Sequence, residues 1–341
     1  MAAVAARDES RAEAFALRHA IPKAYGCYDE MLADPDIDAV YNPLPNSLHG
    51  PWTLKALAAG KHVLCEKPFA SNAAQAQQVA DAAAASGLVV MEAMHYRYHP
   101  LIQRLRDVVA ELGPVRHIQC WTSFVIEDPD DIRYDYDLAG GALMDGGCYA
   151  IDCLRLLGDG DPSVSGALAD PWPGVAAPGE QEAAAGERAA GERAAADRAA
   201  ADRAAADRAA ADRAAADRAI AVRLAFPGGA TGWFESAFTR NGEFRADVHV
   251  SCRDGQVWMQ NFIQAHQGRL MATRKDVLVA DEHGSGDTTY TWQLRAFAAA
   301  IAAVNEGSPA DKALPTSAAH AVATMRVIDD AYRAADLALR P

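Results

Sequence analysis

Roughly the first 90 residues alternate short apolar runs with amphipathic stretches, and no other feature of the sequence constrains the fold as strongly. The strand-like runs are "AVAARD", "IDAVYNPLP", "KHVLCEKP" and "LVVMEAMHY". Stretches between them place apolar side chains three and four residues apart, as on one face of a helix. Strands and helices in this alternation predict a parallel sheet with crossover helices, the doubly wound α/β architecture.

From about residue 101 the pattern changes, and strand-like runs such as "VRHIQCWTSFVI" and "TGWFESAFT" dominate. This change predicts a second domain of the α+β class with a mostly antiparallel sheet. A chain of 341 residues is long for one core, because domains of about 100 to 200 residues are usual. We therefore expect domains at 1–100 and 101–341, with a helix at 316–338 that packs back on the first domain.

Residues 183–218 form a low-complexity insert that repeats a five-residue unit, first "AAGER" and then "AAADR". A charged pair in every repeat advances about 140° around a helix of about 3.6 residues per turn, so charges occur on every side. No apolar stripe remains to pack on a core. We expect a solvated, frayed helix or a disordered loop, and an expanded repeat rather than a partner-binding arm.

The overall composition excludes several classes of function. The 32 basic and 46 acidic residues give a formal net charge of −14, which leaves no basic surplus for binding nucleic acid. No apolar run approaches the roughly 20 residues that span a bilayer, so we expect no membrane contact and a cytoplasmic location. The cysteines show no C-x-x-C spacing, so we expect reduced thiols rather than disulfides, and no metal site.

Polar clusters follow three of the predicted parallel strands, in "NPLPNSLH", "EKP" and "EAMHYRYHP". Because ligands of doubly wound sheets bind beyond the carboxyl ends of the strands, these clusters converge on one crevice. Lys67, within "EKP", is then a candidate site residue. A single lysine at a strand end is more often a solvated loop residue, and only the convergence favours a functional role.

A fourth cluster, "GGALMDGGCYAIDCLRLLG", spans residues 140–158. Asp145 and Tyr149 are four residues apart and share one face if this stretch is helical. The glycines around Asp145 would let a ligand approach the backbone at the start of the helix. An ordinary helix with a buried tyrosine explains the pattern equally well, so both interpretations stay open.

Together, "AGKHVLCEKPFA", "PLPNSLH", "EAMHYRYHP" and "GGALMDGGCYAID" resemble the glucose-fructose oxidoreductase, inositol dehydrogenase and rhizopine-catabolism (Gfo/Idh/MocA) family. The similarity is greatest to the branch with dimeric dihydrodiol dehydrogenase, D-xylose 1-dehydrogenase and glucose-fructose oxidoreductase. It implies an N-terminal Rossmann domain for a nicotinamide cofactor and a C-terminal α+β domain whose open sheet covers the substrate. It also implies a homodimer formed through that sheet.

The resemblance implies a catalytic set of Lys67, Asp145 and Tyr149. Lys67 would lie at the carbon that exchanges hydride with the nicotinamide, where partial burial lowers the pKa of its ammonium. Tyr149 would contact the substrate as the acid/base, with Lys67 favouring its ionised form and Asp145 orienting the pair. Oxidation would pass a hydroxyl proton to Tyr149 as hydride leaves for the cofactor.

The same resemblance implies further contacts with a cofactor and with a sugar or diol substrate. Arg7 would pair with the 2′-phosphate of NADP, whereas the adjacent Asp8 keeps NAD as the alternative. Arg97 and Arg133 would hold the substrate. The expected cofactor contacts are Arg7, Pro45, Asn46, His49, Glu66, Lys67 and Pro68, with a cis peptide bond before Pro68.

The beginning of the sequence departs from the family pattern, because "AVAARD" matches the second strand and no G-x-G-x-x-G turn precedes it. We therefore expect an incomplete dinucleotide-binding domain that lacks its central strand and has free strand edges or a gap. Two functions remain open. One is an NADP-dependent dehydrogenase acting on the CH–OH of sugars or diols, and the other is a non-catalytic remnant that binds sugar or forms a dimer.

Overall fold

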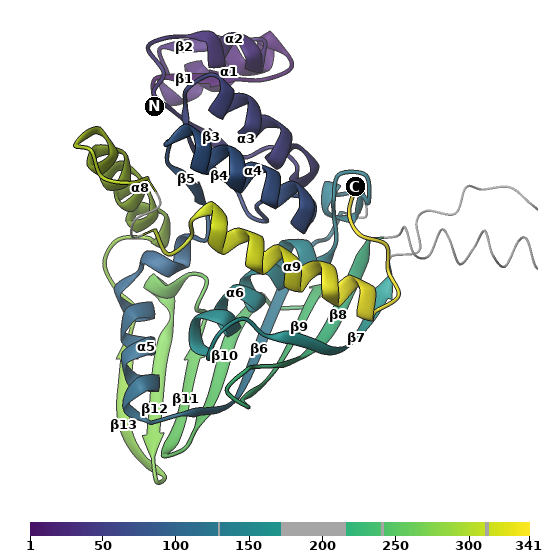
Figure 1. Cartoon of the computed structure of the whole chain (residues 1–341), viewed down its shortest axis with the longest axis vertical. Coiled ribbons are helices and arrows are strands. Elements are labelled where there is room, and N and C mark those ends of the chain that lie inside the picture. Colours follow the sequence, from purple (N-terminus) through teal and green to yellow (C-terminus); the bar gives the residue numbers. More distant parts are fainter. Residues whose placement is uncertain (129, 172–215, 240–241, 311–313) are drawn as a thin grey trace, which may run out of the picture.

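The chain folds into a parallel α/β part followed by a large, mostly antiparallel sheet with helices on one face (Figure 1). This is the fold class that the sequence predicts. The computed structural model describes residues 1–128, 130–171, 216–239, 242–310 and 314–341.

Neighbouring strands of the first part pair in parallel, as the alternating pattern predicts. The elements are β1 (Ala3–Ala5), α1 (Glu9–His19), β2 (Lys23–Tyr25), α2 (Tyr28–Ala33), β3 (Ala39–Asn42), α3 (His49–Ala58), β4 (His62–Cys65), α4 (Ala73–Ser86) and β5 (Val90–Glu92). The strands lie in two sheets, β1-β2 and β3-β4-β5. The break between these sheets falls where the sequence analysis expects a gap.

The second part is built on one sheet with the strand order β13-β12-β11-β10-β6-β9-β8-β7. Its elements are α5 (Pro100–Glu111), β6 (Val115–Val125), α6 (Cys148–Leu157), β7 (Ser163–Pro171), β8 (Asp217–Ala225), β9 (Thr231–Thr239), β10 (Arg245–Cys252), β11 (Gly255–Gln260), β12 (Arg269–Arg274), β13 (Val277–His283), α8 (Thr289–Asn305) and α9 (Ala318–Ala334). β6 and β9 pair in parallel, and the other neighbouring strands of this sheet pair antiparallel.

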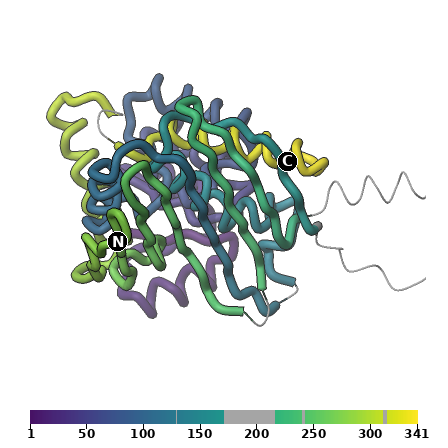
Figure 2. The backbone as a smooth tube through the Cα atoms, turned by 90° about the horizontal axis from the view of Figure 1, so that it is seen from below, coloured from purple at the N-terminus to yellow at the C-terminus, as the bar shows by residue number. Residues whose placement is uncertain are grey.

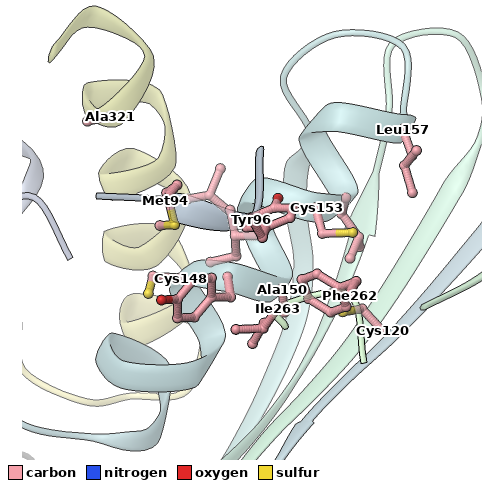
Figure 3. Packing of buried hydrophobic residues seen from close by; sticks show 14 of the residues in the cluster. Met94, Tyr96, Cys120, Cys148, Ala150, Cys153, Leu157, Phe262, Ile263 and Ala321 are labelled. Carbon is pink, nitrogen blue, oxygen red and sulfur yellow. The ribbon is translucent and has the colours of Figure 1, made fainter. Parts of the chain in front are cut away.

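Helices α5, α6 and α9 cover one face of the large sheet, and Figure 2, seen from below, shows the strands in front of the helices. A continuous core runs from the parallel strands through these helices to the sheet. Tyr96, just after β5, packs edge to face on Phe262 with ring centroids 5.2 Å apart (Figure 3). Helix α9 also packs along α4, and the segment before α9 pairs with Met91 of β5. The end of the chain therefore contacts the parallel part.

The alanine-rich insert ends earlier than the sequence predicts. Asp217 and Arg218, the last two residues of the repeat, belong to β8, so the predicted boundary at 218 is wrong. The reason is that the Asp217 carboxylate is buried and hydrogen-bonded. The prediction of a frayed helix or loop concerns residues 183–215, which lie outside the described residues.

Two other sequence features have a direct structural outcome. All six cysteines are free, as predicted. Among the helices of the described residues, none combines the length and apolarity that a membrane crossing requires.

Candidate active site

A cavity of about 270 Å³ opens at the carboxyl ends of β3 and β4. One side of its wall comes from residues that follow these two strands, and the other side comes from residues between β6 and α6. The lining residues are Pro43, Leu44, Pro45, Asn46, His49, Glu66, Lys67, Ile132, Arg133, Leu138 and Asp145. Segments from both parts of the chain therefore meet at one site.

Lys67 is held by the carboxylate of Asp145 at this cavity. Its Nζ donates to Oδ1 of Asp145 at 2.6 Å and to the backbone carbonyl oxygen of Asp145 at 2.9 Å. Nε of Arg133 lies 3.3 Å from the other carboxylate oxygen, Oδ2. Because the side chains of Lys67 and Asp145 are only 14% and 13% exposed, the two cations and the carboxylate interact with little screening by water.

The positive charges of Lys67 and Arg133 and the negative charge of Asp145 stabilise one another. Burial, the largest single influence, lowers the pKa of Lys67, but the negative charge of Asp145 together with the smaller effects of Cys148 and Glu66 outweighs burial, and the pKa is raised. The expectation of a lowered Lys67 pKa is therefore wrong for this arrangement. Burial raises the pKa of Asp145, but Lys67 and then Arg133 outweigh it, and the pKa is lowered. Lys67 is thus an ammonium and Asp145 a carboxylate at neutral pH.

Tyr149 lies next to Lys67 but bonds to another residue. Its hydroxyl oxygen lies 3.1 Å from Nε2 of His95, while the Lys67 ammonium lies over the tyrosine ring, 5.0 Å from the centroid. The Tyr149 side chain is buried and does not line the cavity. Burial, followed by the charge of Glu66, raises the pKa of Tyr149 well above its usual value. The phenol is therefore neutral at neutral pH, and the Lys67 ammonium contacts its ring rather than its hydroxyl.

A glycine and a buried carboxylate shape the helix start that carries Asp145. Gly141 has φ of +132°, and a Cβ there would collide with the side chain of Asp217. Oδ2 of Asp217 accepts from the backbone N–H of Leu143 at 2.7 Å, and Oδ1 accepts from Nη2 of Arg340 at 2.6 Å. The turn is thus anchored to the end of the chain, and it continues through a π-helical turn, Leu143–Gly147, into α6.

Glu66 and the loop after β3 form the rest of the wall. The Glu66 carboxylate accepts from the Tyr41 hydroxyl at 2.7 Å and from the Lys67 backbone N–H at 3.2 Å. Pro45 precedes a short turn, and Nδ2 of Asn46 donates to the carbonyl oxygen of Ala139 at 2.9 Å. The Asn46 contact joins the parallel part to the loop before the helix start.

His49 and Pro68 stabilise this wall from behind. The Lys67–Pro68 peptide bond is cis, as the family resemblance implies. The His49 ring nitrogens lie 2.7 Å from the carbonyl oxygen of Pro68 and 2.6 Å from that of Leu44. Since His49 is almost fully buried, these contacts hold the two loops together.

Two predicted arginines lie away from the cavity. Arg7 is exposed after β1, and within the described residues it makes no hydrogen bond or ion pair. Asp8 is the N-cap of α1, where its carboxylate accepts from the backbone N–H groups of Ser10 and Arg11. Nη1 of Arg97 lies 3.3 Å from both carboxylate oxygens of fully buried Asp152. The guanidinium of Arg97 is therefore engaged in an interior ion pair, and its predicted substrate contact stays a prediction.

The sequence analysis missed the residues that surround Tyr149. Nδ1 of His95 lies 2.8 Å from Oγ1 of Thr289, and the Tyr290 ring stacks on His95 with centroids 4.0 Å apart. His95 stands within "EAMHYRYHP", so its place at a strand end was a usable signal. Thr289 and Tyr290 begin α8, and no local pattern in the sequence connects them with this site.

Comparison with known proteins agrees with this architecture. Residues 1–94 match the model of the oxidoreductase family with NAD-binding Rossmann fold (GFO/IDH/MocA), and residues 102–258 match the GFO/IDH/MocA C-terminal domain. D-xylose 1-dehydrogenase (NADP(+)) 2 of Haloferax volcanii is 50% identical over 157 residues, which are 46% of this chain and 48% of that protein. Trans-1,2-dihydrobenzene-1,2-diol dehydrogenase of Sus scrofa is 40% identical over 158 residues, 46% of this chain and 47% of that protein.

The chain thus matches about half the length of these curated relatives. A solved structure of aldose-aldose oxidoreductase from Caulobacter crescentus, complexed with glycerol, has a TM-score of 0.76 and 25% identity. That match covers 98% of this chain and 89% of the other. With both parts matched in order by models of one family, the chain belongs to the Gfo/Idh/MocA oxidoreductases.

Proposed function

We propose that this protein is a nicotinamide-dependent oxidoreductase that transfers hydride between NADP and the CH–OH or carbonyl carbon of a small sugar or diol. The observation that carries the proposal is the meeting of Lys67, Asp145 and Tyr149 beside a cavity at the strand ends. Lys67 lies 78 residues before Asp145 in the chain, and Tyr149 follows Asp145 by four residues. The names of the relatives, a xylose dehydrogenase and a dihydrodiol dehydrogenase, support the substrate class.

The donor set fits the ring and ribose end of a nicotinamide nucleotide. Glu66 offers carboxylate oxygens for ribose hydroxyls, Pro45 offers an apolar surface for the ring, and Asn46 offers an amide oxygen. Cavities of about 300 to 1,000 Å³ are usual for small-molecule sites, and the observed volume of about 270 Å³ is just below that range. Among the described residues no G-x-G-x-x-G turn occurs. When bound, NADP would supply the two-electron hydride chemistry.

The protonation state of the site suits reduction of a carbonyl. Lys67 is an ammonium on the cavity wall and Tyr149 is a neutral phenol beside it, so both are proton donors at neutral pH. We infer that Lys67 hydrogen-bonds the substrate oxygen and that Tyr149 donates the proton as that oxygen gains charge. Asp145 keeps the ammonium in place, and Arg133 holds another substrate hydroxyl across the cavity. Oxidation would reverse the proton path and become faster at high pH.

Turnover of single variants tests these roles. Lys67→Ala and Tyr149→Phe should each reduce turnover of a sugar or diol with NADP(H) by about 10²-fold or more, as loss of an acid/base group usually does. Lys275→Ala, an exposed lysine in the β12–β13 turn, is the matched control and should keep full turnover. Normal turnover in both site variants would contradict the proposed roles.

The second candidate function is a sugar-binding protein without redox activity. Calorimetric titration with NADPH and NADH distinguishes the two. Binding of NADPH supports the enzyme, whereas binding of sugar without either nucleotide supports the second candidate.

Arg7 is the proposed contact for the 2′-phosphate of NADP. Asp8 does not compete for a ribose, because its carboxylate caps α1. Arg7→Ala should weaken NADPH binding at least tenfold while leaving NADH binding unchanged, since a charged hydrogen bond is worth about 1.5–3 kcal/mol. Arg116→Ala, which removes an exposed arginine from β6, is the control. If Arg7→Ala weakened the binding of NADPH and NADH equally, Arg7 would not be the contact for the 2′-phosphate.

We also propose a homodimer through the open face of the large sheet. Trp121 contacts Trp233 and Trp258 there, with centroids 5.6 and 5.8 Å apart, and Arg245 lies over the Trp121 ring. A depression of about 740 Å³ beside Trp121 leaves room for side chains of a second copy. Light-scattering mass tests this, and Trp121→Lys should yield monomers.

A cytoplasmic location and the domain limits at 1–100 and 101–341 stay predictions.

A further inference from the structure

Tyr149, His95 and Thr289 form a hydrogen-bonded chain beside the cavity. The Tyr149 hydroxyl oxygen lies 3.1 Å from Nε2 of His95, and Nδ1 of His95 lies 2.8 Å from Oγ1 of Thr289. The three residues are 3%, 2% and 0% exposed. Tyr290 stacks on the imidazole with an interplanar angle of 26°. The ring therefore has one orientation, in which each nitrogen faces one hydroxyl.

The imidazole in this chain is neutral. Burial, followed by the positive charge of Lys67, lowers the pKa of His95 to about 3. A neutral imidazole carries one N–H and one acceptor nitrogen. Each hydroxyl partner can both donate and accept, so the chain has two orientations. In the first, Tyr149 donates to Nε2 and Nδ1 donates to Thr289, and in the second both hydrogen bonds are reversed.

The two orientations differ in whether Tyr149 can donate its phenol proton to a substrate. In the first orientation its proton is shared with His95 and is not available to a substrate. In the second orientation, Nε2–H donates to the Tyr149 oxygen and the phenol proton is free. If that proton moves to a substrate oxygen, the phenolate left behind already accepts a hydrogen bond from Nε2–H, which stabilises the negative charge.

We propose that His95 is the positioning residue for Tyr149, and that reversal of the chain from Thr289 through His95 releases the phenol proton and stabilises the resulting phenolate. This inference rests on the proposed acid/base role of Tyr149. The groups that face Tyr149 and His95 are Glu66, Lys67, Asp145, Cys148, His266 and Tyr290. Tyr96 also packs on the Tyr149 ring, but its hydroxyl donates to Asp152. Among the described residues only His95 hydrogen-bonds to the Tyr149 hydroxyl.

The tautomer of His95 gives a direct test that needs no activity. Nitrogen-15 NMR of protein with labelled histidine reads which ring nitrogen carries the proton, and His95→Gln assigns the resonance. A buried N–H needs an acceptor, so the proton should move to the nitrogen that still faces a hydroxyl. Tyr149→Phe should give the Nδ1–H form, and Thr289→Val should give the Nε2–H form. His117, bonded to Thr231 on the large sheet, is the internal control and should not change.

The proposal fails if both variants show the same tautomer, or if His95 is doubly protonated at neutral pH. In turnover assays, His95→Leu should reduce kcat about 10- to 100-fold with little change in KM, the effect of one hydrogen bond to a charged group. His95→Gln, whose amide places an N–H near the position of Nε2, should recover part of that loss. Full kcat in His95→Leu would overturn the inference while leaving the proposed function intact. Absence of turnover in the unaltered protein would refute the proposed function. The NMR experiment would still show whether the hydrogen-bond chain of Tyr149, His95 and Thr289 can reverse.

Discussion

Replacing Asp145 by asparagine should reverse the direction of the Lys67 pKa shift. The carboxylate lies 2.6 Å from the ammonium, and both side chains are mostly buried. A neighbouring opposite charge in such a setting shifts a pKa by about 1–3 units, and one unit corresponds to about 1.36 kcal/mol. Without the carboxylate, burial and the nearby Arg133 charge both disfavour the ammonium. The pKa of Lys67 should therefore fall by about 1–3 units and pass below its ordinary value.

NMR of protein with carbon-13-labelled lysine measures this change. The chain has six lysines, so the Lys67 signal is readily resolved and is assigned by Lys67→Arg. Asp131→Asn is the matched control, because Asp131 pairs with Arg133 at 3.1 Å but has no contact with Lys67. An unchanged Lys67 pKa in Asp145→Asn, or an equal shift in Asp131→Asn, would refute the assignment of Asp145 as the controlling charge.

The same substitution has a signed effect on stability. Because the pKa of Lys67 is raised in the folded protein, the ion pair stabilises the fold below the pKa of the unfolded chain, and this contribution is lost as pH rises through the folded pKa. Asp145→Asn should therefore lower the free energy of unfolding most at neutral pH. The difference in the free energy of unfolding between Asp145→Asn and the unaltered protein should become smaller in alkaline solution.

Further predictions concern buried carboxylates outside the cavity. Asp217→Ala should lower the free energy of unfolding by about 3–5 kcal/mol in urea denaturation, because it leaves Arg340 buried without a counter-charge. Asp170→Ala, which breaks the exposed ion pair with Arg218, is the control and should lower the free energy of unfolding by less than about 1 kcal/mol. Equal losses of stability in Asp217→Ala and Asp170→Ala would contradict this account. Burial raises the pKa of Glu92 to about 8 from 4.5, so the folded state keeps a proton that the unfolded chain releases. Stability should consequently fall as pH rises between these values, and Glu92→Gln should remove that fall; a pH-independent stability of the unaltered protein would refute the raised pKa.

The sequence predicted the parts of the site that are encoded by local pattern. The strand-end position of Lys67 follows from the apolar run before it, and the helix with Asp145 and Tyr149 follows from its apolar stripe. Parallel strands must place their carboxyl ends at one edge, so the meeting of "NPLPNSLH" and "EKP" at the cavity could be predicted without coordinates, whereas no residue of the third predicted cluster, "EAMHYRYHP", lines it.

Pairing among the polar groups was not predictable from pattern. The sequence analysis joined Lys67 to Tyr149, but the structure joins Lys67 to Asp145 and Tyr149 to His95. The ion pair of Arg97 with the buried carboxylate of Asp152 was likewise not predicted. Such choices depend on separations of a few ångströms and on burial, because the strength of a charge interaction changes steeply with both.

The amino-acid sequence by itself determined the fold class, the order of the elements and the edge of the sheet where the chemistry lies. It did so because hydrophobic periodicity and strand-end position are local properties of the chain. Only the tertiary structure decided which protonation states those residues have and which partners they use. It places Thr289 against His95, 194 residues away, and Arg340 against Asp217, 123 residues away. Proton affinity inside a protein is set by such distant neighbours and by the exclusion of water, and neither is written in any single stretch of sequence.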